Sequence, residues 1–323
     1  MKLVAYELDK QPRLGVVEGE WIVSVSAAIQ LLQKKRVPRA LSDRAQFKNA
    51  ARRVLDAGAA PKDMIELLER GQAWCKSLGV VASSFVKTIE AAKAPRGLLT
   101  PLAKARLLAP IPKPGKITCV GLNYADHARE QGTEPPKAPI FFLKSGNTIC
   151  GPGEPIQLPP NSSQVDYEAE FAVVIGKRGK RIPEDKAYDY VAGYMILHDI
   201  SARDLQFSDG QWFRGKSCDT FAPTGPWIVT RDEIKDPHNL RISLTLNGET
   251  MQDSNTSNLI FKVPYLISYL SQSITWEVGD LISTGTPPGV GVFRKPPVFL
   301  APGDTVSVTV EGLGTLTNPV VGP

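Results

Sequence analysis

The sequence predicts an α+β protein in two parts, a small α+β N-terminal domain over residues 1–110 and a larger, strand-rich domain over residues 111–323. Between residues 26 and 95 apolar side chains recur at helical spacing, whereas the later chain has short apolar runs bounded by turn residues. An extended, proline-rich stretch that starts at Leu98 marks the boundary, with prolines at Pro101, Pro110, Pro112 and Pro114.

The N-terminal domain is expected to begin with a β-hairpin. Lys2–Leu8 and Leu14–Val23 have strand-like patterns, with turn residues between them and Gly19 near a second turn. Ala, Leu, Arg and Lys dominate the segment that follows. Two or three helices are predicted there from apolar positions such as Ile65, Leu67, Leu68 and Trp74.

Composition excludes several classes of protein. The 323 residues are 42% hydrophobic and 22% charged, as in ordinary globular chains. No apolar run approaches the roughly 20 residues that span a bilayer, so no membrane association is expected. The N-terminus lacks the pattern of a signal peptide, and the four cysteines are scattered. Neither disulfides nor a zinc cluster is therefore expected, and the predicted location is cytoplasmic.

The net charge of +5 is unevenly distributed along the chain. Residues 1–110 contain 19 Lys and Arg against 10 Asp and Glu, whereas residues 111–323 contain 19 against 23. The basic residues are not interleaved with aromatic side chains and form no dense run beyond residues 34–36. A solvated basic face is therefore the favoured interpretation, and nucleic-acid binding is not expected.

The second part is expected to consist of short strands, turns and loops with two helices. An Asn-Gly pair at residues 247–248 between apolar segments is a strong hairpin signal. Pro264 is tolerated in the first turn of a helix that extends to Ser271. The remaining predicted elements are a helix over residues 123–130 and strands over residues 116–120, 140–143, 171–175, 191–197 and 305–310.

Two carboxylates, Glu168 and Glu170, stand at the entrance to the apolar run Phe171–Ile175. Successive side chains of a strand point to opposite faces, so these two residues share a face with only Ala169 between them. Two anions beside a core are costly unless a positive charge holds them together, and a divalent cation would do so. By itself, however, such a pair on a strand is more often a solvated edge.

A third carboxylate, Asp199, follows the strand predicted over residues 191–197 and can complete an all-oxygen site. Such ligands suit a hard cation, Mg²⁺ or Mn²⁺ with Ca²⁺ as a further candidate, and they argue against zinc. The neighbouring His198 falls on the opposite face by alternation, and it is interpreted as a structural histidine with satisfied hydrogen bonds.

His127 and Glu130 form a candidate proton-transfer pair, because residues three apart on a helix share a face. Histidine is the usual general base near neutral pH, and an adjacent carboxylate fixes its tautomer. Without other evidence, a surface ion pair is the simpler interpretation.

Two loops contain further candidates for binding anions. Lys216, in a glycine-flanked loop, could clamp an oxyanion or a carboxylate, with a solvated lysine as the alternative. Residues 283–292 are rich in Gly and Pro and could cradle an anion through backbone N–H groups. A plain tight turn is equally consistent with this loop.

Taken together, these segments resemble the fumarylacetoacetate hydrolase family over about residues 110–318. Five separated motifs occur in the family's order, and no departure is found at their positions. They are Gly121–Tyr124 followed by His127 and Glu130, Asp166–Glu170, His198-Asp199 through Arg203 and Gln206, Gly215-Lys216 with Asp219, and Thr284–Pro287. The resemblance implies a C-terminal mixed β-roll, usually in a homodimer, behind a variable N-terminal domain.

The resemblance also implies roles for individual residues. His127 and Glu130 would be the catalytic pair that activates water, on a segment that orders over the site as a lid. The ligands of Mg²⁺ or Mn²⁺ would be Glu168, Glu170 and Asp199. Substrate oxygens would be contacted by Lys216, Arg203 and Gln206, and the substrate carboxylate by Thr286.

The family acts on 2-oxo acids, and the leading hypothesis is hydrolysis of a carbon–carbon bond in an acylpyruvate or fumarylpyruvate-like 1,3-dicarbonyl acid. The metal would chelate the 2-oxo carboxylate, His127 would take a proton from water, and Lys216 would stabilise the oxyanion. The alternatives use the same enolate without attack by water. They are tautomerisation or decarboxylation of oxaloacetate, isomerisation of a hydroxymuconate-type diacid and dehydration of a sugar-derived 2-oxo acid. A non-catalytic binding protein that kept the fold is a hypothesis of another class.

Overall fold

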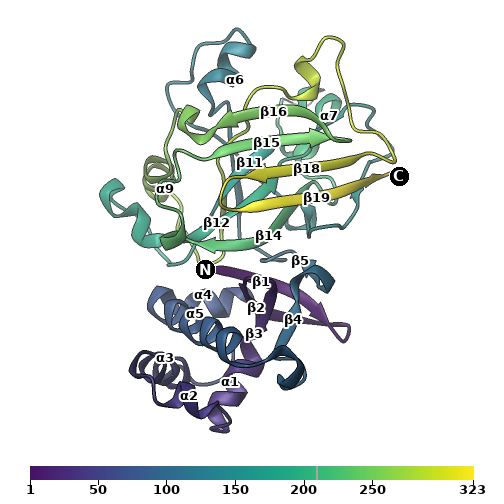
Figure 1. Cartoon of the computed structure of the whole chain (residues 1–323). Coiled ribbons are helices and arrows are strands. Elements are labelled where there is room, and N and C mark those ends of the chain that lie inside the picture. The colour runs from purple at the N-terminus through teal and green to yellow at the C-terminus, as the bar shows by residue number, and fades with distance from the viewer. Residues whose placement is uncertain (209) are drawn as a thin grey trace.

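The computed structural model describes residues 1–208 and 210–323 and confirms the α+β fold class. Figure 1 shows the N-terminal helices at one end of the molecule and the C-terminal strands at the other. The helices are α1 (Val25–Gln33), α2 (Arg39–Ser42), α3 (Ala45–Asp56), α4 (Met64–Glu69), α5 (Gly71–Thr88), α6 (Ala125–Glu130), α7 (Arg203–Ser208), α8 (Phe213–Lys216) and α9 (Val263–Ser271). None of these described helices is both long and apolar enough to cross a membrane.

The larger of the sheets is mixed and has 12 strands among the described residues. Its main path is β4-β3-β2-β1-β14-β12-β11-β17-β6-β7, with β5 beside β1 and β8 beside β14. Pairing is antiparallel except between β6 and β17 and between β8 and β14. The strands are β1 (Lys2–Leu8), β2 (Gln11–Glu18), β3 (Trp21–Ser24), β4 (Leu99–Pro101), β5 (Arg106–Leu108), β6 (Ile117–Gly121), β7 (Ile140–Lys144), β8 (Ile149–Cys150), β11 (Ala169–Ile175), β12 (Val191–His198), β14 (Ala222–Thr230) and β17 (Leu281–Ser283).

A second sheet of five strands has the order β16-β15-β18-β19-β9. The predicted hairpin is confirmed, because Asn247 and Gly248 have φ of 53° and 86°, as a tight two-residue turn requires. A separate pair, β10 (Val165–Asp166) with β13 (Ser201–Ala202), joins two motif segments. The five strands are β9 (Ile156–Gln157), β15 (Arg241–Leu246), β16 (Glu249–Asn255), β18 (Thr305–Val310) and β19 (Gly314–Val321).

The central strands β11 and β12 are buried on both faces, which explains why they read as continuous apolar runs. Phe171 and Val173 of β11 belong to the core shared with β15 and β18 of the second sheet. Ala172 and Val174 point the other way, into the core that the N-terminal helices cover. Alternation along β11 therefore divides the protein into two hydrophobic layers, one on each side of the large sheet.

The N-terminal residues are joined to the rest of the chain by strand pairing. Lys2 and Leu3 of β1 lie opposite Val229 and Ile228 of β14, so the large sheet runs through both parts of the molecule. The proline-rich stretch is not a free linker, since β4 and β5 within it pair with β3 and β1. The domain division at residue 110 stays a prediction.

Two local expectations differ from the structure. The segment Leu14–Val23 is not one strand, because Gly19 adopts φ of 58° in a turn that separates β2 from β3. The N-terminal region has five described helices rather than two or three. Pro38 at the start of α2 and Gly71, the first residue of α5 with φ of 79°, break the helical pattern into shorter pieces.

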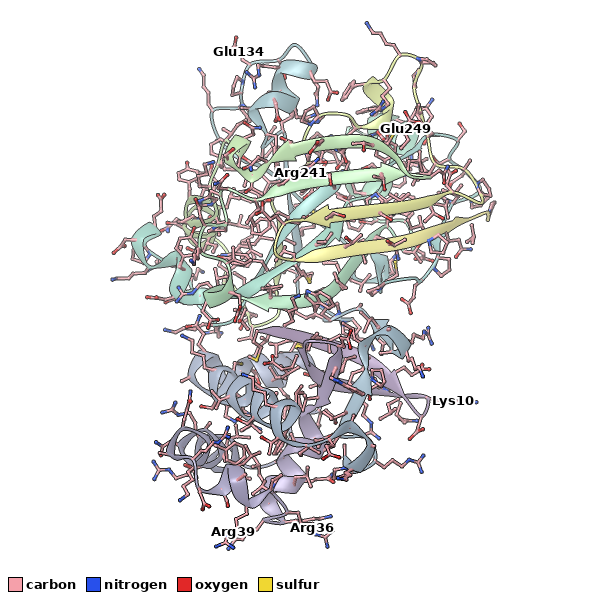
Figure 2. All side chains as sticks on the ribbon, viewed as in Figure 1. Lys10, Arg36, Arg39, Glu134, Arg241 and Glu249 are labelled. Carbon is pink, nitrogen blue, oxygen red and sulfur yellow. The ribbon has the colours of Figure 1, made fainter. Side chains whose placement is uncertain are left out.

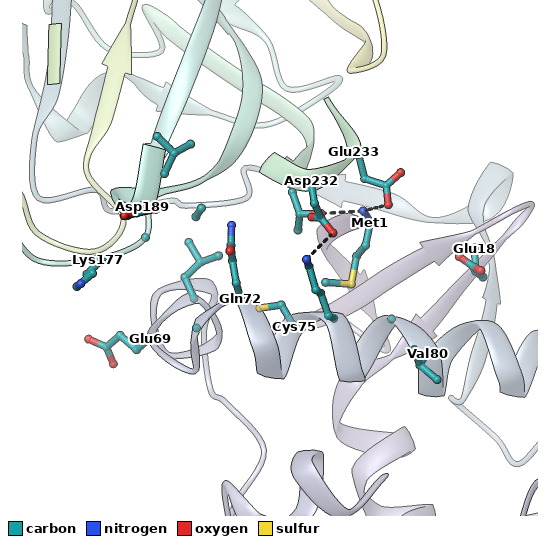
Figure 3. A pocket seen from close by; sticks show the side chains of 18 residues that line it. Met1, Glu18, Glu69, Gln72, Cys75, Val80, Lys177, Asp189, Asp232 and Glu233 are labelled. Carbon is teal, nitrogen blue, oxygen red and sulfur yellow. Dashed lines mark hydrogen bonds and ion pairs between the residues drawn. The ribbon is translucent and has the colours of Figure 1, made fainter. Parts of the chain in front are cut away.

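The joint between the two parts contains ion pairs and a cavity of about 570 Å³ (Figure 3). The amino group of Met1 lies 2.6 Å from Glu233, and Lys76 of α5 lies 3.7 Å from Asp232. None of the residues predicted for catalysis lines this cavity. Figure 2 shows Arg36 and Arg39 extending into solvent at the far end of the N-terminal helices, as a solvated basic face requires.

We expect Gly193→Ala to destabilise the protein, because a Cβ at Gly193 of β12 would lie 2.2 Å from the carbonyl oxygen of Val229. Overpacking against backbone should lower the free energy of unfolding by about 1–3 kcal/mol in urea denaturation. Gly146→Ala is the matched control, because its Cβ would meet no atom within 4 Å. Equal destabilisation of the two variants would contradict the packing described here.

Candidate active site

Three buried carboxylates meet at the ends of the central strands. Oxygen atoms of Glu168, Glu170 and Asp199 all lie within 4.8 Å of one another. The pairing of Ala169 with His198 in the β11–β12 ladder brings the start of β11 beside the residue that follows β12. The structure thus brings together the three residues predicted as metal ligands.

Two buried lysines hold these carboxylates. Lys216 Nζ donates to Glu168 Oε2 at 2.7 Å and to Asp199 Oδ2 at 2.9 Å. Lys144, at the end of β7, donates to Asp199 Oδ1 at 2.6 Å and to the carbonyl of Ile200 at 3.0 Å. Lys216 is therefore not a solvated lysine. Sequence reasoning missed Lys144, although a lysine that directly follows an apolar strand is a signal for a buried, paired cation.

Arg203 of α7 bridges a fourth carboxylate to the cluster. Its Nε donates to Asp166 Oδ2 at 2.8 Å, and its Nη2 donates to Glu168 Oε1 at 2.7 Å. Asp166 also accepts the backbone N–H groups of Gly291 and Val292 at 2.7 and 3.1 Å. The glycine-rich loop is therefore held by this carboxylate, and Asp166, which had no predicted role, anchors both the loop and Arg203.

The cluster has one positive charge too few. Among its described residues, four carboxylates face three cations: Asp166, Glu168, Glu170 and Asp199 against Lys144, Arg203 and Lys216. Burial opposes ionisation of Glu168, but the charges of Lys216 and Arg203 outweigh it and lower the pKa to about 2.

Glu170 is the carboxylate without a cationic hydrogen-bond partner among the described residues. It accepts from the Ser283 hydroxyl and, at 3.0 Å, from the backbone N–H of Gly285. Burial and the charges of Asp199 and Glu168 raise its pKa well above the usual range. A divalent cation among the three carboxylates would reverse that effect, so the donor set fits a hard cation.

The predicted His–Glu pair forms beside the carboxylates. His127 Nδ1 lies 2.9 Å from Glu130 Oε2, and Glu130 Oε1 accepts the N–H of Gly289 at 2.9 Å. The pair is only partly at the surface, because His127 is 5% exposed whereas the Glu130 side chain is 25% exposed. An ionised carboxylate can only accept, so Nδ1 carries the proton and Nε2 holds the lone pair. That lone pair faces the amide nitrogen of Gln131 at 2.8 Å, a residue that sequence reasoning missed.

Helix α6, which carries this pair, is fastened outside the cavity. Asp126 Oδ2 accepts from Ser254 Oγ at 2.6 Å and from Asn258 Nδ2 at 3.0 Å. Just before the helix, Asn123 donates to the carbonyl of Thr284 at 2.8 Å. These contacts join the helix to β16 and to the loop after β17, and so hold His127 over the carboxylates.

A cavity of about 90 Å³ connects the two groups, and aromatic side chains line it. Gly121 permits the close approach of Trp212, because a Cβ there would lie 2.5 Å from the Trp212 ring. The other predicted contact residues also line it. Gln206 Oε1 accepts from Arg203 Nη1 at 3.0 Å, and Thr286 Oγ1 accepts from Gln252 at 2.9 Å. All nine predicted site residues are thus in or beside one cavity, and their roles stay predictions.

His198 is buried, but the expectation of satisfied hydrogen bonds is wrong at one atom. Its Nε2 has no hydrogen-bond partner among the described residues. Burial and the nearby charge of Lys144 lower its pKa to about 3. A neutral histidine is therefore enclosed in the folded protein.

The family described as fumarylacetoacetate (FAA) hydrolase C-terminal matches residues 116–321. The mitochondrial oxaloacetate tautomerase Fahd2a of Rattus norvegicus is 50% identical over 264 residues, which are 81% of this chain and 81% of the rat protein. The predicted cytoplasmic location is not confirmed by this relative.

Solved structures are similar over the full length of the chain. A fumarylacetoacetate hydrolase from Exiguobacterium antarcticum has a TM-score of 0.78 and 33% identity, covering 100% of both chains. A maleylpyruvate hydrolase from Sphingobium sp. SYK-6, in complex with manganese (II) ion and pyruvate, has a TM-score of 0.71 and 29% identity, covering 100% of this chain and 99% of the other.

We expect Glu170→Gln to weaken Mn²⁺ binding, because the variant loses one of the three carboxylates. Changes next to metal ligands alone cost about 10–100-fold in affinity, so losing a ligand should raise the dissociation constant at least about hundredfold in calorimetry. Asp253→Asn is the control, since Asp253 is an exposed carboxylate paired with Arg241. Unchanged Mn²⁺ affinity in Glu170→Gln would contradict the site.

Stability should fall as the pH drops below about 6.5, because unfolded His198 takes up a proton that the folded protein excludes down to about pH 3. Between pH 7 and pH 5 this residue should account for about 2 kcal/mol of lost stability. In His198→Leu the difference in unfolding free energy between the two pH values should shrink by that amount. An unchanged difference would show that His198 is not enclosed in its neutral form.

Proposed function

The chain belongs to the fumarylacetoacetate hydrolase family, and on this basis we propose that it is a divalent-metal-dependent enzyme that interconverts the keto and enol forms of oxaloacetate. The similarity to an oxaloacetate tautomerase over most of both chains supports this reaction. The observation that carries the proposal is a His127 paired with Glu130 that lines one small cavity together with the carboxylates Glu168 and Glu170. The hydrolysis expected from the sequence becomes the second candidate.

A metal ion would be held by Glu168, Glu170 and Asp199, the carboxylates one charge short of neutrality. When bound, Mg²⁺ or Mn²⁺ would supply Lewis-acid stabilisation of negative charge on the 2-oxo oxygen. The manganese complex of a related hydrolase supports a divalent ion.

Keto–enol conversion requires a base at C3 of oxaloacetate and a proton donor at the 2-oxo oxygen. His127 Nε2 carries the lone pair and is the base, while Glu130 stabilises the imidazolium that forms. Lys216, an ammonium group at the cavity wall, is the donor that can hand a proton to the oxygen. After the enol leaves, His127 releases the proton from C3 to water and Lys216 takes a proton from water, so both groups return to their starting states. The reverse conversion uses the same groups with their roles exchanged.

Two polar side chains are oriented to bind the substrate's carboxylates. Thr286 Oγ1 already accepts from Gln252, so its own hydrogen is left to donate. Gln206 accepts from Arg203 through Oε1, which leaves its amide N–H groups for the substrate. Arg203 is already engaged by Asp166 and Glu168, so we assign it mainly to positioning rather than to direct substrate contact.

The size of the cavity supports a small substrate. Its volume of about 90 Å³ is far below the roughly 300–1,000 Å³ of sites for drug-sized ligands. A four-carbon dicarboxylate suits such a space better than a longer diacid. The second candidate, acylpyruvate hydrolysis, is supported by the related maleylpyruvate hydrolase and by the capacity of a His–Glu pair to activate water.

The test is to follow decay of enol-oxaloacetate absorbance with Mg²⁺ or Mn²⁺ and, in parallel, release of acetate from acetylpyruvate. We expect faster tautomerisation with enzyme, little acetate, and a loss of about 10²–10⁴-fold in His127→Gln, the usual contribution of a general base. Glu134→Gln, an exposed carboxylate close to Glu130 in sequence, should keep full activity.

Acetate release that exceeds tautomerisation would overturn the proposal in favour of hydrolysis. No activity on either substrate in the metal-loaded protein would overturn both candidates.

A further inference from the structure

Gln131 is placed to control what reaches the catalytic base. Its backbone N–H bonds to the carbonyl of His127 at 3.1 Å, at the end of α6, so its side chain is tethered one turn from the imidazole. The Gln131 amide nitrogen lies 2.8 Å from His127 Nε2, and both residues line the cavity. Because Nε2 carries a lone pair, the bond is an N–H donated by Gln131 to the base.

This position is the one that a hydrolytic water would need. A water activated by His127 must also lie within hydrogen-bond distance of Nε2, between the base and the carbonyl carbon that it attacks. The tethered amide competes with free water for the same lone pair and has the higher effective concentration. The Phe293 ring, 6.1 Å from the His127 ring, borders the same cavity of about 90 Å³.

A substrate carbon also competes with the Gln131 amide for His127 Nε2, but it does so with the binding energy of the whole substrate. The substrate is anchored at its carboxylate end, so its binding energy can displace the amide and place C3 against Nε2. A water molecule brings no such energy. The amide therefore obstructs water more than it obstructs a bound substrate.

We propose that Gln131 is a positioning residue that determines reaction type. It keeps a hydrolytic water from the His127 base and so confines the site to proton transfer at the substrate carbon. This inference rests on the proposed tautomerase function. It defines the substrate class as small 2-oxo acids that leave the site with every carbon–carbon bond intact.

The reaction that Gln131 would suppress is hydrolysis, in which one water is consumed and every atom and proton is accounted for. Acetylpyruvate and water would give acetate and pyruvate: the water oxygen bonds to C4, and its proton goes to His127 Nε2. The C3–C4 bond then breaks, its electron pair stays with C3, and C3 recovers the proton from His127. No oxidant or further reactant is needed.

The test compares Gln131→Ala with the wild-type, metal-loaded enzyme on oxaloacetate and on acetylpyruvate. We expect the ratio of acetate release to enol-oxaloacetate decay to rise about tenfold or more, as for loss of one hydrogen bond at the base. ¹⁸O from labelled water should appear in the acetate. Gln272→Ala, an exposed glutamine on the surface that does not line the cavity, should leave the ratio unchanged.

Gln131→Glu separates this role from simple support of the helix. A carboxylate can only accept, so it would draw a proton onto Nε2 and shift the acidic limb of the pH–rate profile to higher pH. An unchanged or lower acetate ratio in Gln131→Ala, or an unmoved pH profile in Gln131→Glu, would overturn the inference.

The outcomes distinguish this inference from the proposed function. If the wild type tautomerises oxaloacetate and the ratio stays constant in Gln131→Ala, only the role of Gln131 fails. If the wild type does not tautomerise oxaloacetate, the proposed function fails. The inference then fails with it, because it rests on that function.

Discussion

The site depends on the balance of charge inside one buried cluster. Four carboxylates cannot be removed from water unless cations accompany them, and Lys144, Arg203 and Lys216 supply three. The carboxylate that lacks a cationic partner is Glu170, which accepts from a hydroxyl and a backbone amide instead. A divalent cation there would make the cluster positive by one charge, which suits an anionic 2-oxo acid. The same arrangement thus supports both the proposed metal site and the proposed substrate class.

The fold keeps this cluster rigid by building it on strands that are packed on both faces. β11 and β12 lie between the second sheet and the N-terminal helices, so their ends cannot shift without disturbing two cores. The His127 pair sits on the short helix α6, fastened by side chains rather than by a core. The residues predicted as metal ligands are therefore at the ends of strands that are buried on both faces, and the predicted base is on a short helix held by side-chain hydrogen bonds.

Much of this site could be predicted from sequence, because its signals are local. Glu168 and Glu170 share a strand face, and His127 and Glu130 share a helix face. Lys144 and Asp166 could not be assigned, because their partners are brought together by tertiary structure. Gln131 lies one helical turn from His127, so this contact was local and was simply missed. Lys144 of β7 meets Asp199 across 55 residues of sequence, so only the folded chain places them together. The pairing of β1 with β14 could not be predicted from the sequence either, since the proline-rich stretch suggested a linker between two separate domains.

The charge balance at the three carboxylates is tested most directly by anomalous diffraction at the manganese absorption edge from crystals grown with Mn²⁺. We expect one strong peak bounded by oxygens of Glu168, Glu170 and Asp199, the atoms that already lie within 4.8 Å of one another. Manganese bound elsewhere with no peak between these carboxylates would contradict the account, since the cluster would then be complete without a metal ion.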